Sequence, residues 1–500
     1  MSQQVFLFMN WGDGWVSLTS HVNSMAALAG LSCRWGVDTP DEQPDPAVLS
    51  FRVLDRTGDL AGRAATLAGA RVLLQLSESP RWSSLPSFTY DSSDLTWSKL
   101  PSKYTPDIPD VASASAQTLF DGIVSTGGEV RPVAGGWMLS LTASSRMIVL
   151  KRLSSKGPTN TAAKYKGLHW VGSPAERVAE INKRARAANA PTVDTTGLEL
   201  PPNVAPYDDS DFPSLLDLLH RLYAHSGRML LWCEKPSKTA SVIGYTALAD
   251  PVTIGTNANG DAYTTVDGER RDAVDGSRIP ADESYIIPEP VTQITLTCRS
   301  VKKNSDNVLE IGDTQTVYGD GGLLPANLKN TQSAITRESD VITSDESGGT
   351  WGGVLWSPTS EGKATASAWL YAVNMRLRAQ NIVFDSRRVE PAERPELYRT
   401  CPSGPLVITN ATAARLVGDD GKPAFTGAWT TIGGTLTFDW EADEPVLRHE
   451  TTIWPLPVYS AVKWSDLSGW TATYDDVEIT WADLSIMSPA AAAIAERTPV

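Results

Sequence analysis

Apolar and polar residues alternate along much of the first part of the chain. In the run 48–54, large apolar side chains occupy every second position. This period of two is typical of a half-buried strand, because successive side chains of a strand point to opposite faces. The runs 70–76 and 137–143 repeat the pattern, whereas residues 77–117 are rich in Ser, Pro and Asp. We therefore interpret residues 1–155 as a small β-barrel or sandwich with a long loop at 77–117.

Helical spacing replaces this alternation in residues 156–290. A predicted helix over 173–189 begins with the string Ser-Pro-Ala-Glu, a capping box with Pro at the first helical position. A second helix, over 211–227, carries leucines along one face and ends at a glycine. An apolar run at 228–233 predicts a strand, and the Gly-rich and Asp-rich residues 251–287 predict loops or hairpins. The pattern indicates an α+β unit.

The rest of the chain alternates between strand-like and turn-like stretches. Residues 291–299 predict a strand, and the polar residues 301–362 predict turns. A third helix is expected over 364–378, followed by a strand at 381–384. From 405 to 487 the pattern returns to short strands and turns. The predicted fold class is mainly β with α+β insertions.

Length and charge limit the possible classes of protein. At 500 residues the chain is too long for one hydrophobic core, so about three or four compact units are expected. Its apolar runs are far shorter than the roughly 20 residues of a membrane helix, and its N-terminus shows no export-signal pattern. We expect a soluble protein made in the cytoplasm. The formal net charge of -15 argues against a surface that wraps nucleic acid, and suits either plain solubility or a protein that lets DNA pass without binding it.

The four cysteines are predicted to be buried free thiols. Their wide separations match neither a small disulfide framework nor a paired zinc knuckle. Three of them lie inside or beside apolar, strand-like runs, where a thiol behaves as a small apolar group. They are Cys33, Cys233, Cys298 and Cys401.

Residue types that bind metals occur without the required spacing. His449-Glu450 lacks the second histidine that a metalloprotease places one helical turn away. His220 and His225 are five residues apart, about 140° around a helix, and are expected to be surface or helix-end histidines. The string 257–268 begins like a calcium loop but has Ala at its sixth position and Gly at its twelfth, and 419–421 reads as a turn. No metal or cofactor site is predicted.

Catalytic motifs are also missing from the sequence. The chain contains no Gly-x-Ser-x-Gly elbow, and the glycine-rich residues 319–322 lack the Lys and the helix of a phosphate loop. Carboxylate pairs for glycoside cleavage can lie far apart in sequence, so spacing does not test them. We predict no catalytic residue and interpret the chain as a non-enzyme. The tryptophans of the C-terminal third are predicted to anchor strand cores and interfaces, with sugar stacking as the alternative; they are Trp429, Trp440, Trp454, Trp464, Trp470 and Trp481.

Several short strings, found near both ends of the chain, carry a family resemblance. The first half contains Cys33-Arg-Trp-Gly36, Asp45-Pro-Ala-Val-Leu-Ser-Phe-Arg-Val-Leu-Asp55, Thr57-Gly58, Phe120-Asp-Gly-Ile123, Leu139-Ser-Leu-Thr-Ala143 and Ala175-Glu-Arg-Val-Ala-Glu-Ile181. The C-terminal part contains Trp464-Ser-Asp-Leu467 and Trp481-Ala-Asp-Leu484. Together these strings resemble minor tail proteins of phages that infect actinobacteria. Residues 251–362 show no such resemblance.

That family is similar in plan to the baseplate hub of contractile phages and to the tail-associated proteins of siphophages. The resemblance implies two small β-barrels with helix-containing insertions, assembled as a trimer at the end of the tail tube. Two barrels per subunit would match the sixfold symmetry of the tube. The implied division is a first barrel at 1–155, an α+β domain at 156–290, a second barrel from 291–300 and 381–487, an insertion with one helix at 301–380, and a tail at 488–500.

The resemblance implies a structural virion protein of the phage tail tip, assembled in the host cytoplasm. A homotrimeric hub would join the tail tube and distal tail ring to a central fibre and help to close the DNA channel. Its expected partners are the distal tail protein, the tape measure protein, and the central fibre or downstream minor tail proteins, with no specific nucleic-acid binding. Two alternatives stay open, namely a hexameric distal tail protein and a tail-tip adhesin or glycan hydrolase that contacts the host cell wall.

Overall fold

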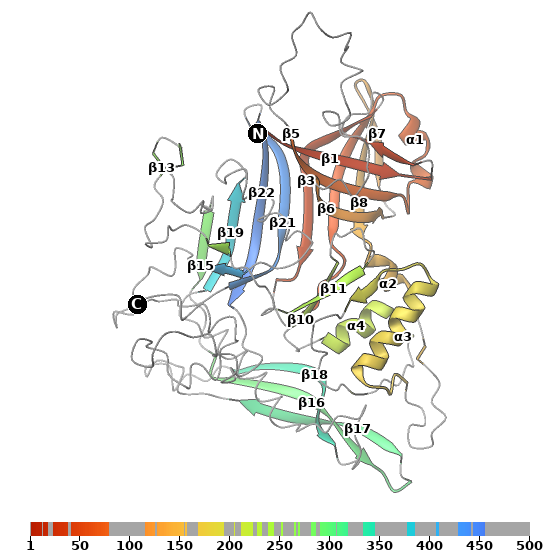
Figure 1. Cartoon of the computed structure of the whole chain (residues 1–500), viewed down its shortest axis with the longest axis vertical. Coiled ribbons are helices and arrows are strands. Elements are labelled where there is room, and N and C mark those ends of the chain that lie inside the picture. Colours follow the sequence, from red (N-terminus) through yellow and green to blue (C-terminus); the bar gives the residue numbers. More distant parts are fainter. Residues whose placement is uncertain are drawn as a thin grey trace, which may run out of the picture.

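A computed structural model shows a mainly β protein (Figure 1). Among the residues that the structure describes, most strands belong to one 14-stranded sheet, and three smaller sheets accompany it. The predicted fold class, mainly β with α+β insertions, is confirmed. The structure describes residues 2–79, 116–157, 169–194, 205, 212–244, 252–253, 265–270, 282–286, 291–318, 334–345, 378–385, 407–409 and 429–455, apart from short gaps at 13, 19–23, 39–41, 126–127, 155, 224–227, 233–238, 267–268, 307 and 442–443.

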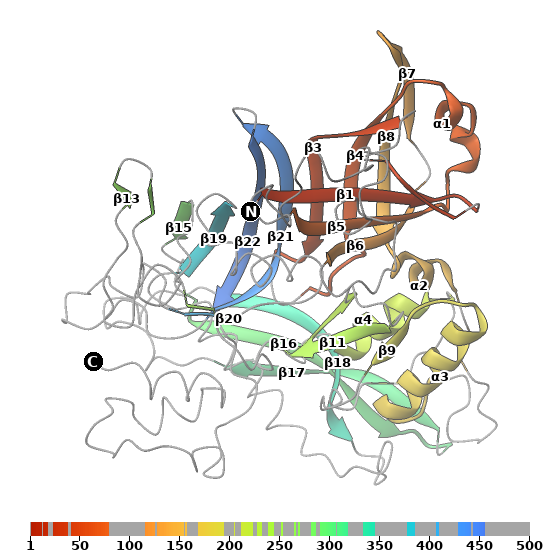
Figure 2. The same cartoon turned by 45° about the horizontal axis from the view of Figure 1, so that its top comes forward.

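The first half of the large sheet is built from the N-terminal strands. In β4, Leu49, Phe51 and Val53 are buried while Ser50 and Arg52 are exposed, which confirms the predicted alternation. Figure 2 shows β1 crossing β3, β4 and β8, so the sheet folds over a shared apolar core. Its elements are β1 (Ser2–Asn10), β2 (Trp15–Ser17), β3 (Ser24–Gly36), β4 (Val48–Asp55), α1 (Asp59–Gly62), η1 (Ala64–Thr66), β5 (Arg71–Ser79), β6 (Ala116–Val124), β7 (Glu129–Val133) and β8 (Gly136–Ser145).

The C-terminal strands continue the same sheet. Strand β21 pairs antiparallel with β22 on one side and with β3 on the other, so it joins the last part of the chain to the first. Beyond β22 the order continues through β19 to β15. Among the described residues this path runs open from β15 to β2, and closure into two barrels stays a prediction. These elements are β12 (Val252–Thr253), β15 (Asp282–Ile286), β19 (Arg378–Asp385), β20 (Val407–Thr409), β21 (Trp429–Glu441) and β22 (Glu444–Pro455).

The α+β unit has a core of its own. Ser173 starts α3 with a complete capping box to Glu176, as the sequence predicted. Helix α4 buries its leucines against α2 and α3, which confirms the predicted apolar face. The predicted strand at 228–233 is present as β10. The elements are α2 (Ile148–Arg152), α3 (Pro174–Ala187), β9 (Thr192–Asp194), α4 (Leu215–Tyr223), β10 (Arg228–Trp232) and β11 (Thr239–Gly244).

A three-stranded sheet corrects the prediction for residues 301–362. Polar composition predicted turns there, but the structure contains β17 (Leu309–Tyr318) and β18 (Ala334–Asp345). Both pair with β16 (Gln293–Lys303), β17 antiparallel and β18 parallel. Because β16 supplies a row of buried apolar side chains, its more polar neighbours complete the sheet. In the described part of the chain, the strand predicted at 291–299 therefore pairs within this sheet and not with β19, β21 or β22.

Several predictions concern residues that the structure does not describe. They include most of the loop at 77–117, the paired Trp strings at 464–484 and the tail at 488–500. The helix predicted over 364–378 also lies outside the described residues, except for Arg378, which begins β19 and is not helical. Within 251–287, the short strands β13 (Thr265–Val266) and β14 (Glu269–Arg270) form an antiparallel pair, which confirms a hairpin there. No helix in the described residues is long and apolar enough to cross a membrane.

Replacing Ser173 with Ala is expected to lower the free energy of unfolding by about 1 kcal/mol. The Ser173 hydroxyl accepts from the Glu176 amide at 3.3 Å, and the Glu176 carboxylate accepts from the Ser173 amide at 2.8 Å. Urea unfolding followed by circular dichroism measures the change. Ser50→Ala, at an exposed position of β4, is the control and should cost less than about 0.5 kcal/mol. Equal effects of the two variants would contradict the capping role.

Candidate functional site at two domain junctions

No group of three or more His, Cys, Asp or Glu side chains that could hold a metal occurs among the described residues. Cys33 and Cys298 are buried free thiols, as predicted, and His449 is fully buried in β22. The remaining candidates lie outside the residues that the structure describes. They are His225, Cys233, Cys401 and the strings 257–261, 319–322 and 419–421.

His220 lies in the last turn of α4, which confirms a helix-end histidine. Burial lowers the pKa of His220 to about 4, although the carboxylates of Asp45 and Asp217 act in the opposite direction. Near it, Lys151 of α2 contacts Asp45 at 2.7 Å, which ties the α+β unit to the segment that enters β4. Since the folded pKa lies below the ordinary value of 6.5, the unfolded chain binds more protons between these values. The neutral imidazole therefore stabilises the fold above pH 6.5, and this stability is lost as the pH falls towards 4.

The first junction, here called the seam, is the pairing of residues 31–36 of β3 with residues 433–438 of β21. Gly36 is opposite Gly433, and both backbones are closely packed. A Cβ added at Gly433 would lie 2.5 Å from the carbonyl oxygen of Val37, and one at Gly36 would lie 2.2 Å from a carbonyl oxygen of β21. Gly36 also has a φ of 73°, a conformation that favours glycine. The two backbones thus meet where no side chain fits.

A buried hydrogen bond crosses the seam. The indole nitrogen of Trp35 donates to Nε2 of His449 at 3.1 Å. Gly434 is paired with Trp35 on one side and with Thr451 on the other, so no side chain on β21 separates the two rings at this level. An indole nitrogen is a donor only, and Nε2 must therefore be the unprotonated nitrogen of a neutral imidazole. The apolar residues of β3, β21 and β22 belong to one core with the N-terminal strands.

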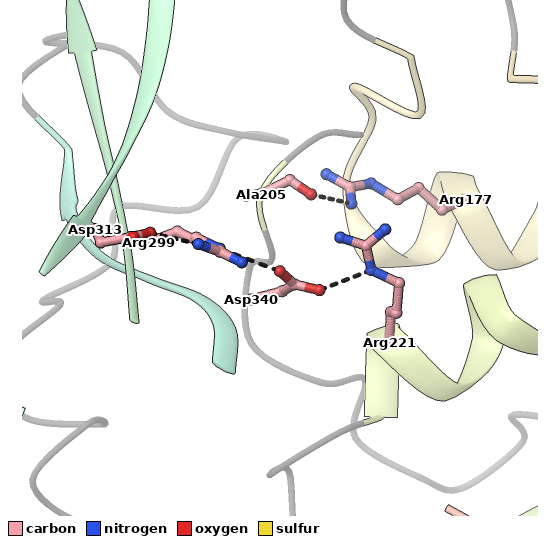
Figure 3. Close-up of polar contacts among 6 residues, drawn as sticks. All are labelled: Arg177, Ala205, Arg221, Arg299, Asp313 and Asp340. Atoms are coloured by element: carbon pink, nitrogen blue, oxygen red, sulfur yellow. Dashed lines mark hydrogen bonds and ion pairs between the residues drawn. The ribbon is translucent and has the colours of Figure 1, made fainter. Parts of the chain in front are cut away.

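The second junction joins the α+β unit to the three-stranded sheet through Asp340 of β18 (Figure 3). Arg221 of α4 donates to Asp340 Oδ2 at 2.7 Å, and Arg299 of β16 donates to Asp340 Oδ1 at 3.2 Å. Arg299 also contacts Asp313 of β17. The Asp340 side chain is 14% exposed, so these charges interact with less solvent screening than a surface pair.

Backbone contacts extend this junction towards α3. The amide of Ala205 donates to the carbonyl oxygen of Asp340 at 2.9 Å. The carbonyl of Ala205 accepts from Nη1 of Arg177 at 3.0 Å, as Figure 3 shows. Arg177 is buried in α3 and also donates through Nε to the carbonyl of Gly172 at 2.7 Å. Helix α4 therefore contacts β18 directly through Arg221, and α3 is linked to β18 through Ala205.

The two arginines favour the charged form of Asp340. Burial alone raises the pKa of a carboxyl, but the hydrogen bonds and charges of Arg221 and Arg299 outweigh it, so the pKa of Asp340 lies below its usual value. Burial likewise opposes the charge of Arg299, but Asp313 and Asp340 outweigh it and raise the pKa of Arg299. Both junctions are arrangements for holding units together.

Neither junction is predicted by a local pattern in the sequence. Gly433 and Gly434 lie inside an apolar, strand-like pattern, which is a signal for a close backbone approach. Arg221 lies in α4 between the buried Leu219 and Leu222, but nothing local indicates its partner. Asp340 lies in a stretch that was predicted to be turns.

Comparison with known proteins gives matches at the level of structure. No protein-family model matches the chain, and no curated protein does. The chain is similar to the tail protein from Neisseria meningitidis MC58, with a TM-score of 0.44 and 11% identity over 90% of this chain and 96% of that one. It is also similar to the 43 kDa tail protein of prophage MuSo2 from Shewanella oneidensis, with a TM-score of 0.45 and 8% identity over 90% of this chain and 98% of that one. It is similar as well to the prophage tail protein gp18 from Listeria monocytogenes EGD-e, with a TM-score of 0.38 and 7% identity over 89% of this chain and 94% of that one.

Replacing Gly433 with Ala is expected to lower the free energy of unfolding by about 1–3 kcal/mol, because the added methyl group would collide with the backbone at Val37. Urea unfolding measures the change. Gly62→Ala is the control, since a Cβ there meets nothing within 4 Å, and it should be neutral or slightly stabilising. Equal destabilisation by both changes would show that the seam is not closely packed.

Replacing Asp340 with Asn is expected to destabilise the second junction by about 1–3 kcal/mol at pH 7. The pKa of Asp340 is lowered in the folded chain, so the unfolded chain binds more protons as the pH falls. The stabilisation is therefore present above the unfolded pKa of about 3.9 and lost below it. Thermal unfolding of both proteins at several pH values tests this, and the difference should shrink below about pH 4. Asp313→Asn, at a side chain that is 60% exposed, should have a smaller effect.

Proposed function

We propose that the chain is a structural component of a phage tail tip, a homotrimeric hub that joins the tail tube and distal tail ring to a central fibre. One observation carries this proposal. Four of the strings that resemble minor tail proteins fall on adjacent elements of the large sheet. Residues 33–36 end β3 at the seam, 45–55 include its neighbour β4, 139–143 lie in β8, which pairs with β4, and 120–123 lie in β6, which pairs with β8.

A hub must transmit force between its parts without separating. The continuous sheet from β15 to β2 provides such a connection, because the backbone hydrogen bonds of the seam join the N-terminal and C-terminal strands directly. The junction at Asp340 fixes the three-stranded sheet to the α+β unit. These contacts need no reactive group, which agrees with the interpretation of the chain as a non-enzyme.

The net charge is compatible with a place beside the DNA channel, as it is with plain solubility. The chain carries a formal charge of -15. A negative wall repels the phosphate backbone, so DNA would pass through the lumen of a tail tip without binding to it. In this proposal the distal tail protein, the tape measure protein and the central fibre are the neighbours of the hub, and the virion tail tip is its location.

The oligomeric state tests the proposal. Light scattering of the purified chain, coupled to size exclusion, is expected to give about three times the chain mass of 53.8 kDa. A persistent monomer would contradict the hub. A hexamer would instead favour the distal tail protein, whose hexameric ring is the expected alternative. Binding of the purified chain to host cell-wall polymer, lost in Trp470→Ala, would favour the adhesin.

A further inference from the structure

The segment 146–194 is strongly basic within an acidic chain. It includes α2, α3 and β9, and it contains ten Lys and Arg but three Asp and Glu, a formal charge of +7. The other residues contain 33 Lys and Arg and 55 Asp and Glu, a formal charge of -22, which gives the total of -15. A concentration of one sign of charge on one unit attracts groups of the opposite sign.

Exposed cations lie along the outer side of α3. Lys183 and Arg186, three positions apart on the helix, are exposed, and Lys183 contacts Glu180 at 3.4 Å. Arg184 donates through Nη1 to the backbone carbonyl of Lys156, whose own side chain is exposed. Lys156 is therefore held beside α3 and adds a third exposed cation to this side of the unit.

An exposed aromatic ring completes the surface. Phe212 is 55% exposed, and the ammonium of Lys156 lies 5.7 Å from the centre of its ring. A φ of 49° is rare for a bulky residue and costs energy, a combination that points to a use of the exposed ring. Aromatic side chains are enriched in protein–protein interfaces, where they act as anchors. We call the surface formed by Lys156, Lys183, Arg186 and Phe212 the α3 face.

The end of the β21–β22 hairpin carries the opposite charge. Residues 439–444 include four acidic residues and no basic one, and Asp439 is exposed. This end lies at the top of Figure 1 and α3 lies at the lower right, so the two are far apart within one chain and can meet only between copies. Two different surfaces that join successive copies form a head-to-tail interface, the kind that closes a ring of three.

We propose that the α3 face binds the acidic end of the β21–β22 hairpin of a second copy, so that the subunits join head to tail. This inference rests on the proposed homotrimer and names the contact that would close it. Opposite charges set the register of the contact, and Phe212 contributes apolar area that is removed from water. The three exposed cations match the four acidic residues of one hairpin, whereas a DNA backbone needs a longer basic surface.

Light scattering of the full chain over a range of concentrations, at low and high salt, tests the contact. Raising the salt from about 0.1 M to about 1 M shortens the Debye length from roughly 10 Å to 3 Å. The concentration at which half of the trimers dissociate should therefore rise by about tenfold or more. A trimer that does not respond to salt would overturn the inference and leave the hub intact, whereas a monomer under all conditions would overturn both.

Charge reversal on α3 locates the contact. Lys183→Glu with Arg186→Glu should raise the same dissociation concentration by about tenfold or more, because like charges would then face each other between copies. Arg56→Glu with Arg63→Glu is the matched control, since it changes the net charge equally at exposed positions near α1, and it should have little effect. Trimers of equal strength in the two variants would refute the α3 face.

Reversal of both surfaces together gives the sharpest result. Asp439→Lys with Glu441→Lys should weaken the trimer by itself. In a chain that also carries Lys183→Glu and Arg186→Glu, it restores opposite charges, so the dissociation concentration should return to within about threefold of the original. Absence of this rescue, with an unchanged circular dichroism spectrum, would overturn the proposal. So would a fluorescent DNA duplex that binds the unmodified chain and is released by the α3 reversal while the trimer persists, because the α3 face would then be a nucleic-acid surface.

Discussion

Two backbones can approach as closely as β3 and β21 do at Gly36 and Gly433 only where neither residue carries a Cβ. This constraint determines how the chain is organised. The pairing brings the apolar residues of β21 and β22 into the core of the N-terminal strands, and it allows Trp35 to reach His449. Without this contact β21 would lose its hydrogen-bonded pairing with β3.

The two junctions are stabilised by different kinds of interaction. At the seam, backbone hydrogen bonds and apolar burial act together, and a buried hydrogen bond joins Trp35 to His449. At Asp340, four charged side chains compensate one another in a site that is only partly open to water. The seam should therefore respond little to salt, whereas the junction at Asp340 should weaken as exposed parts of its network are screened.

The sequence predicted local structure well where one segment carries its own signal. The alternation in β4 and the capping box at Ser173 are examples, because each depends on residues within a few positions of one another. Strands β17 and β18 were missed, since their polar side chains become strand residues only beside β16. The candidate site was missed for the same reason. Asp340 is 119 residues from Arg221, and Trp35 is 414 residues from His449, distances at which no local pattern indicates a partner.

The separation between Trp35 and His449 has a consequence for synthesis of the chain. A ribosome that adds about 5–20 residues per second needs roughly 20–80 seconds to make the segment between them. During that interval the N-terminal strands can fold while the edge of β3 that later pairs with β21 is still unpaired. An unpaired strand edge is a template for pairing with other chains. The nascent chain is therefore most prone to aggregation before its last strands leave the ribosome. A chaperone would protect it at that stage, as would a long interval between the release of neighbouring copies from their ribosomes.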